Sequence, residues 1–203
     1  MPALWNPDVR LVLGSGSATR RRLLEAAGLP FAVIVPKLDE RAIEAAAPRA
    51  DPGELAATLA RAKALAVSIE APGALAIGAD QTLSLDGRVL HKSLTREAAL
   101  RTLAALSGRT HRLTSAFALA RGGRIVAEDA DSAELTMRRL DEAALALYLD
   151  VASPAVLGSV GVYQWEGLGA HLFERVAGEH STILGLPMLK LLAALRASSA
   201  LRL

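Results

Sequence analysis

The hydrophobic pattern at the start of the chain predicts a strand, a loop and a helix. The run Val9–Leu13, rich in β-branched residues and leucine, stops at the small and polar residues Gly14–Ser17. Helical spacing follows over Arg20–Ala27, and Gly28 ends it. A further apolar run, Phe31–Val35, predicts a second strand.

The segment after this second strand is polar. Pro36 closes the apolar run, and the charged stretch Lys37–Glu40 follows it directly. We interpret Lys37–Glu40 as the polar end of the strand, which places acidic groups at a strand end.

Helical periodicity recurs along the rest of the chain. Apolar residues at helical spacing predict a long helix over Glu54–Glu70, with Asp51 as its N-cap and Pro52 in its first turn. The further predicted helices are Thr95–Ser107, Asp141–Asp150 and Leu186–Leu201. The glycine-dotted stretch Gly158–Gly169 predicts a loop.

The middle of the chain has strand-like patterns separated by turn signals. Ala74–Gly78 and Gln81–Leu85 read as two strands, with Asp80 in the turn region, and Asp86–Gly87 is a hairpin signal before Val89–Leu90. Three further stretches read as strands, the first two as a hairpin around Gly122 and Gly123: Leu113–Ala120, Ile125–Ala127 and Leu135–Arg138. Because helices and strands mix without strict alternation, the sequence predicts an α/β fold with a mixed sheet flanked by helices.

Composition narrows the class of protein. The chain has 203 residues, of which 52% are hydrophobic and 22% charged, so we expect one globular domain over residues 1–203 with two lobes. The absence of cysteine excludes disulfides, thiolate metal sites and thiol nucleophiles. The net charge of +2 and the 3% of aromatic residues argue against a nucleic-acid partner. No apolar run is long enough for a membrane span and Met1–Arg10 lacks a signal-peptide layout, so a cytoplasmic location is expected.

The loop Gly14–Ser17 is the first candidate for chemistry. It opens a helix that carries Arg20, Arg21 and Arg22 in its first turns. Free amides at a helix start bind anions, glycines let the backbone approach a phosphate, and guanidinium groups add bidentate contacts. The alternative is a tight turn with a serine cap and solvated arginines. The pattern is not a P-loop, because the chain has no Gly-x-x-x-x-Gly-Lys-Ser/Thr match.

Two carboxylates stand at predicted strand ends or turns in apolar surroundings. Asp39-Glu40 and Asp80 offer carboxylate oxygens of the kind that a divalent cation shares with substrate phosphates. For Glu40 the alternative is a solvated acid, and for Asp80 it is a turn-capping aspartate.

Cationic and aromatic candidates lie further along the chain. Lys63, in an apolar helical stretch, and Lys92, after the predicted hairpin, could each neutralise a polyphosphate or simply be surface lysines. The four histidines show no zinc-ligand spacing. Tyr163 and Trp165 accompany Glu166 in the late glycine loop, either as part of a base-recognition loop or as core residues.

Six motifs in order resemble the Maf family of nucleoside triphosphate pyrophosphatases over Leu11–Leu195. The motifs are Leu11–Arg21, Val35–Glu40, Leu59–Ala64, Ile77–Gln81, Leu106–His111 and Gly185–Pro187. The resemblance implies a twisted mixed sheet that forms a cleft, as in the inosine triphosphate pyrophosphatases, and a protein that often forms homodimers. It also implies a nucleoside triphosphate as the partner and a divalent cation as the cofactor, Mg²⁺ with Mn²⁺ as the alternative.

The resemblance also assigns roles to individual residues. Asp80 would be the general base or a metal ligand, and Glu40 would help to hold the cation. The triphosphate would be bound by Ser15, Ser17, Arg20, Lys63 and Lys92. The chain departs from the family pattern at Ala18-Thr19, at Ser93 and in the stretch Gly158–Tyr163, which lacks the usual lysine.

Two branches of the family differ at two positions. One branch, which acts on dTTP and UTP, has Thr after the central aspartate and Gln in the late glycine loop. The other acts on 7-methyl-GTP and has Gln and Glu, and this chain has Gln81 and Glu166. The latter branch also carries a tryptophan where this chain has Thr19. The two matches favour 7-methyl-GTP, with Gln81 and Glu166 as substrate-binding residues.

The sequence thus predicts a metal-dependent hydrolase that cleaves a nucleoside triphosphate between its α and β phosphates. The alternatives are a dTTP/UTP pyrophosphatase of the same family and a non-catalytic nucleotide-binding regulator of cell division. The carboxylates of Asp80 and Glu40 argue against the regulator, because carboxylates beside a triphosphate are unfavourable unless a cation lies between them.

Overall fold

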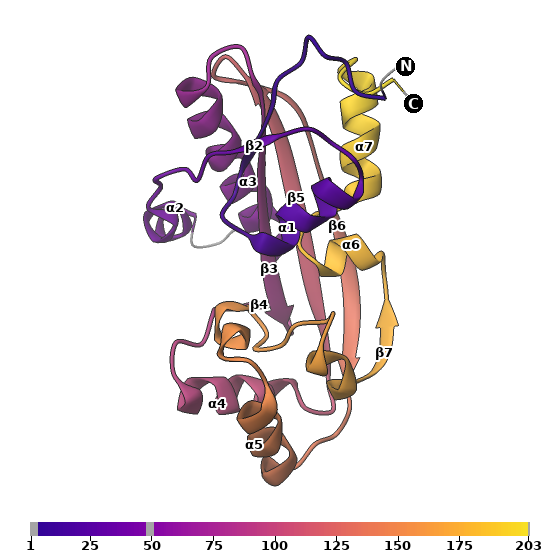
Figure 1. Ribbon diagram of the computed structural model, residues 1–203. Coiled ribbons are helices and arrows are strands. Elements are labelled where there is room, and N and C mark those ends of the chain that lie inside the picture. Colours follow the sequence, from indigo (N-terminus) through magenta and orange to yellow (C-terminus); the bar gives the residue numbers. More distant parts are fainter. Residues whose placement is uncertain (1–3, 48–50, 203) are drawn as a thin grey trace. The chain divides into compact units, whose positions relative to one another are not determined.

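The computed structural model describes residues 4–47 and 51–202. In this part of the chain, seven strands form one mixed sheet in the order β2-β1-β3-β5-β6-β7, with β4 paired to β3 (Figure 1). The strands are β1 (Leu11–Gly14), β2 (Ala32–Val33), β3 (Leu75–Leu85), β4 (Arg88–Leu90), β5 (Thr110–Arg121), β6 (Arg124–Met137) and β7 (Phe173–Ala177). Strand β1 runs parallel to β2 and β3, whereas β4 is antiparallel to β3 and β7 is antiparallel to β6. The predicted class, a mixed α/β fold with a sheet flanked by helices, is confirmed.

Helices connect most of the strands. They are α1 (Ala18–Ala26), α2 (Glu40–Ala46), α3 (Pro52–Glu70), α4 (Arg96–Leu106), α5 (Glu142–Val151), α6 (His180–Ile183) and α7 (Met188–Ala197), with 3-10 turns η1 (Pro154–Gly158) and η2 (Leu168–Leu172). Within the described residues, none of the helices has the length and apolar character that crossing a membrane requires.

The chain divides into two compact units. The first unit comprises the described residues of 1–81, 114–131 and 180–203, and the second comprises 82–113 and 132–179. Strands β3, β5 and β6 each begin in one unit and end in the other.

In the first unit, strand alternation sends apolar side chains to both faces of the sheet. Leu11, Leu13 and Ile77 pack with α1 and α7, which contribute leucines such as Leu24 and Leu191 to the same core cluster. The side chains of the opposite face are smaller. Alanines of α3 pack there against alanines of β5, in the cluster Ala56, Ala60, Ala64, Ala116, Ala118 and Ala120. Small residues let the backbone of α3 lie close to the sheet.

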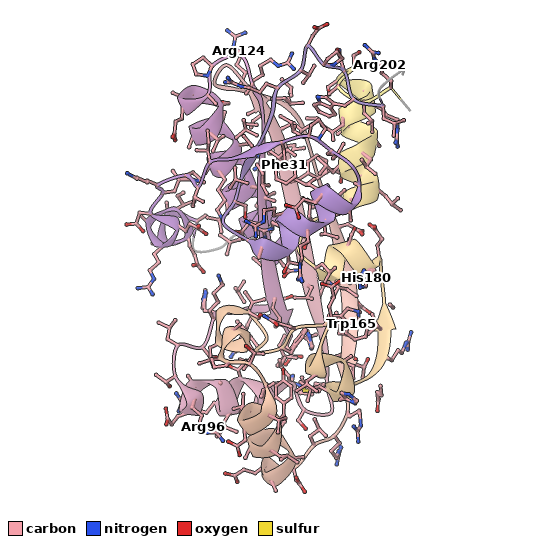
Figure 2. The ribbon with its side chains drawn as sticks, viewed as in Figure 1. Phe31, Arg96, Arg124, Trp165, His180 and Arg202 are labelled. Atoms are coloured by element: carbon pink, nitrogen blue, oxygen red, sulfur yellow. The ribbon has the colours of Figure 1, made fainter. Side chains whose placement is uncertain are left out.

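In the second unit, helices α4 and α5 lie side by side (Figure 1). An aromatic cluster forms separately around Phe173, whose ring centroid lies 4.7 Å from that of Tyr163 and 5.8 Å from that of Trp165. Trp165, labelled in Figure 2, is partly buried and Tyr163 is buried. The core interpretation of Tyr163 is therefore confirmed.

The prediction of two strands around Asp80 was wrong, because Leu75–Leu85 forms the single strand β3 with Asp80 in its middle. Gly78, which lies in this strand, allows close packing against α3. A Cβ atom at Gly78 would lie 2.1 Å from the carbonyl oxygen of Ala60 and 2.3 Å from the amide nitrogen of Ala64, both on α3. A turn does follow at Asp86 and Gly87, whose φ angles of 50° and 76° suit a two-residue hairpin turn.

Two other segments differ from the prediction. Lys37–Glu40 is not a strand end, because Asp39 caps α2 by accepting a hydrogen bond from the amide of Ala42, and Glu40 begins the helix. The last predicted helix, Leu186–Leu201, is shorter and forms α7 after the separate short helix α6. Strand β5 is longer than predicted. The separate strands predicted at Ile125–Ala127 and Leu135–Arg138 are wrong, because both stretches fall on the single strand β6, which ends at Met137. Strand β7 was not predicted.

Candidate functional site

The loop between β1 and α1 has the geometry of a capped helix start. The Ser17 hydroxyl oxygen accepts a hydrogen bond from the Arg20 amide at 3.3 Å, and the Ser15 hydroxyl oxygen accepts one from the Ser17 amide at 3.2 Å. Both hydroxyls act as acceptors in these contacts, so their own protons can be donated to an anion. Arg21 and Arg22 are exposed, which agrees for these two residues with the alternative interpretation of solvated arginines.

Arg20 differs from its two neighbours because its guanidinium is held by the protein. Its Nη1 donates to the Ser15 hydroxyl at 3.2 Å and to the Ala79 carbonyl at 2.9 Å, and its Nε donates to the Gly185 carbonyl at 2.8 Å. Burial lowers the pKa of Arg20, while Asp80 and Glu40 raise it. An arginine nevertheless keeps its charge in proteins. Its Nη2 makes no hydrogen bond to any residue that the structure describes, so Nη2 can contact a ligand.

Lys63 joins the two predicted carboxylates. Its Nζ donates to Asp80 Oδ1 at 2.6 Å and to Glu40 Oε2 at 2.9 Å. Lys63 projects from α3, and its residue exposure is only 8%. The alternative of a surface lysine is therefore wrong, since a buried ammonium is tolerated where carboxylates from other segments reach it, whereas the phosphate-binding role of Lys63 stays a prediction.

The two carboxylates differ in exposure. The Asp80 side chain is 13% exposed and that of Glu40 is 51% exposed. Asp80 shares the α3 side of β3 with Gly78, two residues earlier, and the close approach of α3 at Gly78 brings Lys63 to Asp80. The carboxylate of Asp80 is therefore mostly buried and held by Lys63, whereas the carboxylate of Glu40 is accessible to solvent.

The donor set suits a cation that is shared with a substrate. Within residues 4–47 and 51–202, no three His, Asp or Glu side chains are grouped so that they could enclose a metal ion. Mg²⁺ is usually held by one or two carboxylates together with water and substrate phosphates. Glu40 and Asp80 fit that pattern, and Lys63 would then share its two partners with the cation.

Gln81 turns to the other side of β3. Its Nε2 donates to the Ser115 hydroxyl at 3.0 Å and to the carbonyls of Thr182 at 3.0 Å and Ile183 at 3.1 Å. These contacts with α6 were not foreseen. The motif Gly185–Pro187 lies close to Thr182 in sequence. No pattern in the sequence, however, predicted the hydrogen bonds from Gln81 to Thr182 and Ser115.

Lys92 and Glu166 belong to the second unit. Lys92 is exposed and borders a hollow lined by residues 90–95 and by residues of α4. Glu166 is exposed on the loop that also carries Trp165 (Figure 2). The structure gathers Ser15, Ser17, Arg20, Glu40, Lys63, Asp80 and Gln81 in the first unit. The catalytic, metal-binding and substrate-binding roles of these residues, and of Lys92 and Glu166, stay predictions.

One histidine, His111, is buried in an aromatic cluster. His111, the buried one, forms a hydrogen bond of 2.7 Å between its Nε2 and the Tyr163 hydroxyl. Burial lowers the pKa of His111 to about 4, so this imidazole is neutral at pH 7.

These features define a class of protein with a mixed α/β fold. Its first unit carries the start of a helix, an arginine, and a lysine that is paired with two carboxylates. Such a set of donors and acids suits an anionic ligand. The chain belongs to the Maf family, because the family model described as Maf-like protein matches residues 10–198.

Similar proteins span almost the whole chain. A Bradyrhizobium diazoefficiens protein named nucleoside triphosphate pyrophosphatase is 51% identical over 193 residues, covering 95% of this chain and 96% of its own. A Rhizobium etli protein named 7-methyl-GTP pyrophosphatase is 49% identical over 189 residues, covering 92% and 95%. Among solved structures, a HAM1 protein from Coxiella burnetii aligns with a TM-score of 0.44 and 17% identity, over 65% of this chain and 74% of its own.

Proposed function

We propose that the protein is a nucleoside triphosphate pyrophosphatase that hydrolyses its substrate to the monophosphate and pyrophosphate. The observation that carries this proposal is the buried Lys63, hydrogen-bonded to both Asp80 and Glu40 in the unit that also holds the Arg20 guanidinium. The names of the similar proteins from Bradyrhizobium and Rhizobium support it.

Each side chain has a part in the proposed reaction. Water is the nucleophile, and Asp80 orients it and accepts its proton through Oδ2, since Oδ1 accepts a hydrogen bond from Lys63. The charges of Lys63 and Arg20 offset the charge that develops on the phosphates. The hydroxyls of Ser15 and Ser17 donate to phosphate oxygens.

Glu40 and Asp80 would hold the divalent cation. When bound, Mg²⁺ or Mn²⁺ would supply positive charge at the phosphate oxygens and fix their position. Asp80 would hold the water, and Arg20, Lys63, Ser15 and Ser17 would hold the phosphate groups.

A substrate panel tests the proposed activity. Pyrophosphate release is measured from 7-methyl-GTP, dTTP, UTP, CTP, ITP and ATP with Mg²⁺, with Mn²⁺ and with a chelator. We expect release from at least one triphosphate and its loss with the chelator. Orthophosphate as the product, or binding without turnover of any triphosphate, would contradict the proposal and favour a phosphatase or a non-catalytic regulator respectively.

The Arg20→Ala variant is expected to raise KM and lower kcat for every triphosphate alike, with kcat/KM reduced roughly 10- to 100-fold. Guanidinium contacts to phosphate do not depend on the base, so the loss is uniform across the panel. The matched control is Arg21→Ala, because Arg21 is exposed and pairs with Glu25 on its own helix, 3.7 Å away. A loss that varied with the base offered would show that Arg20 is not a phosphate ligand.

We further propose 7-methyl-GTP as the preferred substrate, with Glu166 as the residue that recognises the base. A glutamate carboxylate can accept hydrogen bonds from N1–H and the exocyclic amino group of guanine, and N7-methylation adds a positive charge that a carboxylate favours. The Rhizobium etli relative, named for this substrate, supports the preference.

The Glu166→Gln variant tests this preference. We expect the wild-type protein to favour 7-methyl-GTP over UTP by roughly 10-fold or more in kcat/KM, and the variant to lose most of that ratio, because Gln is neutral and replaces one acceptor with a donor. Glu174→Gln, an exposed glutamate on β7, is the control and should keep the ratio. A wild-type preference for UTP or dTTP would indicate that Thr19 identifies the branch better.

A further inference from the structure

The late glycine loop Gly161–Gly169, which carries Glu166, has a constrained backbone. Val162 is fully buried and has a φ of +60°, a conformation that a β-branched residue adopts only where its surroundings impose it. The Val162 carbonyl accepts a hydrogen bond from the Tyr148 hydroxyl at 3.2 Å, and the Val162 amide donates to the Ser159 carbonyl at 3.2 Å. These contacts hold the start of the loop in one conformation.

The second half of the loop folds back on itself around Glu166. A Cβ atom at Gly169 would lie 2.4 Å from the carbonyl oxygen of Gln164, so the end of the loop packs against its middle. The Ala170 amide donates to the Gly167 carbonyl at 3.0 Å. The Glu166 side chain is exposed. The backbone therefore sets the place from which this carboxylate can reach a ligand.

The side chain of Tyr163 attaches the loop to two strands of the second unit. Its ring packs edge-on against Phe173 of β7, with the ring centroids 4.7 Å apart. Its hydroxyl forms a hydrogen bond of 2.7 Å with Nε2 of His111 on β5. Trp165, which precedes Glu166, packs against the same Phe173 ring at 5.8 Å between centroids. The residues before Glu166 are thus held by an aromatic cluster that ends at His111.

His111 belongs to a motif, Leu106–His111, to which the proposed reaction gives no role. Within residues 4–47 and 51–202, its buried Nδ1 has no hydrogen-bond partner, so Nε2 alone makes the polar contact. Burial lowers the pKa of His111 to about 4 and raises the pKa of Tyr163, so both groups are neutral at pH 7. The link between the loop and β5 is therefore a single uncharged hydrogen bond.

We infer that His111 and Tyr163 are positioning residues for base recognition: their hydrogen bond holds the loop Gly161–Gly169 in the shape that presents Glu166 to the base of the ligand. The inference rests on the proposed role of Glu166. Neither side chain needs to touch the substrate, because each acts through the loop backbone that leads to Glu166.

The first test uses Tyr163→Phe, which keeps the ring and removes the hydroxyl. Calorimetry with the product monophosphates 7-methyl-GMP and UMP measures base preference without turnover. We expect the ratio of their affinities to fall roughly 3- to 10-fold, the effect of one hydrogen bond, and the kcat/KM ratio of the triphosphates to fall alike. The loss should be confined to the methylated purine. An equal loss for both nucleotides would show a merely structural role, and it would overturn the inference, as would an unchanged ratio.

Two variants of His111 separate its hydrogen bond from the packing of its ring. The amide of His111→Gln reaches the position of Nε2, whereas the shorter His111→Asn reaches only that of Nδ1, which has no partner. We expect Gln to keep the affinity ratio within about twofold and Asn to lose it as Tyr163→Phe does. The control is His171→Asn, an exposed histidine that should keep the ratio. Equal ratios in folded Gln and Asn variants, with Tm as the check, would contradict the inference.

A double-mutant cycle shows whether Tyr163 acts through Glu166. In a Glu166→Gln background, Tyr163→Phe should not change the affinity ratio further, because the group that it positions is gone. Effects that multiply would overturn the inference. Equal binding of both monophosphates by the wild type would overturn it together with the role of Glu166, while pyrophosphate release would still support the proposed activity. A preference that depends on Tyr163, without pyrophosphate release from any triphosphate, would refute the proposed activity alone.

Discussion

The Asp80→Asn variant is expected to reduce kcat at least about 100-fold, the usual cost of removing a catalytic base. Asn has nearly the volume of Asp but carries no charge, so it can neither accept a proton from water at neutral pH nor help to hold a cation. Its side-chain oxygen can still accept a hydrogen bond from Lys63, which retains Glu40 as a charged partner. Pyrophosphate release under saturating substrate and Mg²⁺ measures the loss.

The control for this experiment is another strand carboxylate of the first unit. Glu128 on β6 pairs with Arg61 at 2.6 Å on the surface, where both side chains are 39% exposed. Glu128→Gln should leave kcat within about twofold of the wild type, since exposed ion pairs contribute little. Far-ultraviolet circular dichroism and Tm establish that both variants are folded. A folded Asp80→Asn variant with near-wild-type kcat would exclude Asp80 as the base.

The Gly78→Ala variant is expected to destabilise the protein at or beyond the upper end of the roughly 1–3 kcal/mol typical of overpacking. The added Cβ atom would lie 2.1 Å from the Ala60 carbonyl oxygen and 2.3 Å from the Ala64 amide nitrogen. Both neighbours are helix backbone, so α3 as a whole must move away from β3. A loss of about 3 kcal/mol corresponds to a decrease in Tm of roughly 6–12 °C in a chain of this size. Urea denaturation and thermal unfolding measure both quantities.

The same displacement should impair activity, because α3 carries Lys63. Gly158→Ala is the matched control: Gly158 has no atom within 4 Å of its Cβ position and no positive φ, so its Tm should stay within about 2 °C of the wild type. An unchanged Tm for Gly78→Ala would mean that α3 and β3 are not packed as closely as the structure shows.

Local chemistry accounts for the elements that the sequence predicted correctly. Asp51 accepts hydrogen bonds from the amides of Gly53 and Glu54 and caps α3, and Thr95 caps α4 through the amide of Ala98. The turn at Asp86 and Gly87 uses two positive φ angles, which this pair of residues tolerates. In each case the residues that decide the conformation are neighbours in sequence, so the local sequence pattern was sufficient to predict the cap or the turn.

The wrong strand break at Asp80 and the two readings left open for Lys63 have a common cause, because the local sequence allowed two interpretations of each. The local sequence around Asp80 allowed a turn, and only the tertiary structure shows that β3 continues through it, with α3 packed closely at Gly78. Lys63 could extend its ammonium into solvent or bury it, and burial depends on Glu40 and Asp80, which lie 23 and 17 residues away in the chain.

The sequence by itself therefore determined the class of fold, most helix and turn positions, the family resemblance and which side chains could carry charge for phosphate chemistry. Only the tertiary structure decided which of these charges meet: Lys63 with both carboxylates, Arg20 with the carbonyls of Ala79 and Gly185, and Gln81 with α6. The physical reason is that caps and turns are stabilised by adjacent residues, whereas a buried charge or amide needs partners that only chain folding brings within hydrogen-bonding distance.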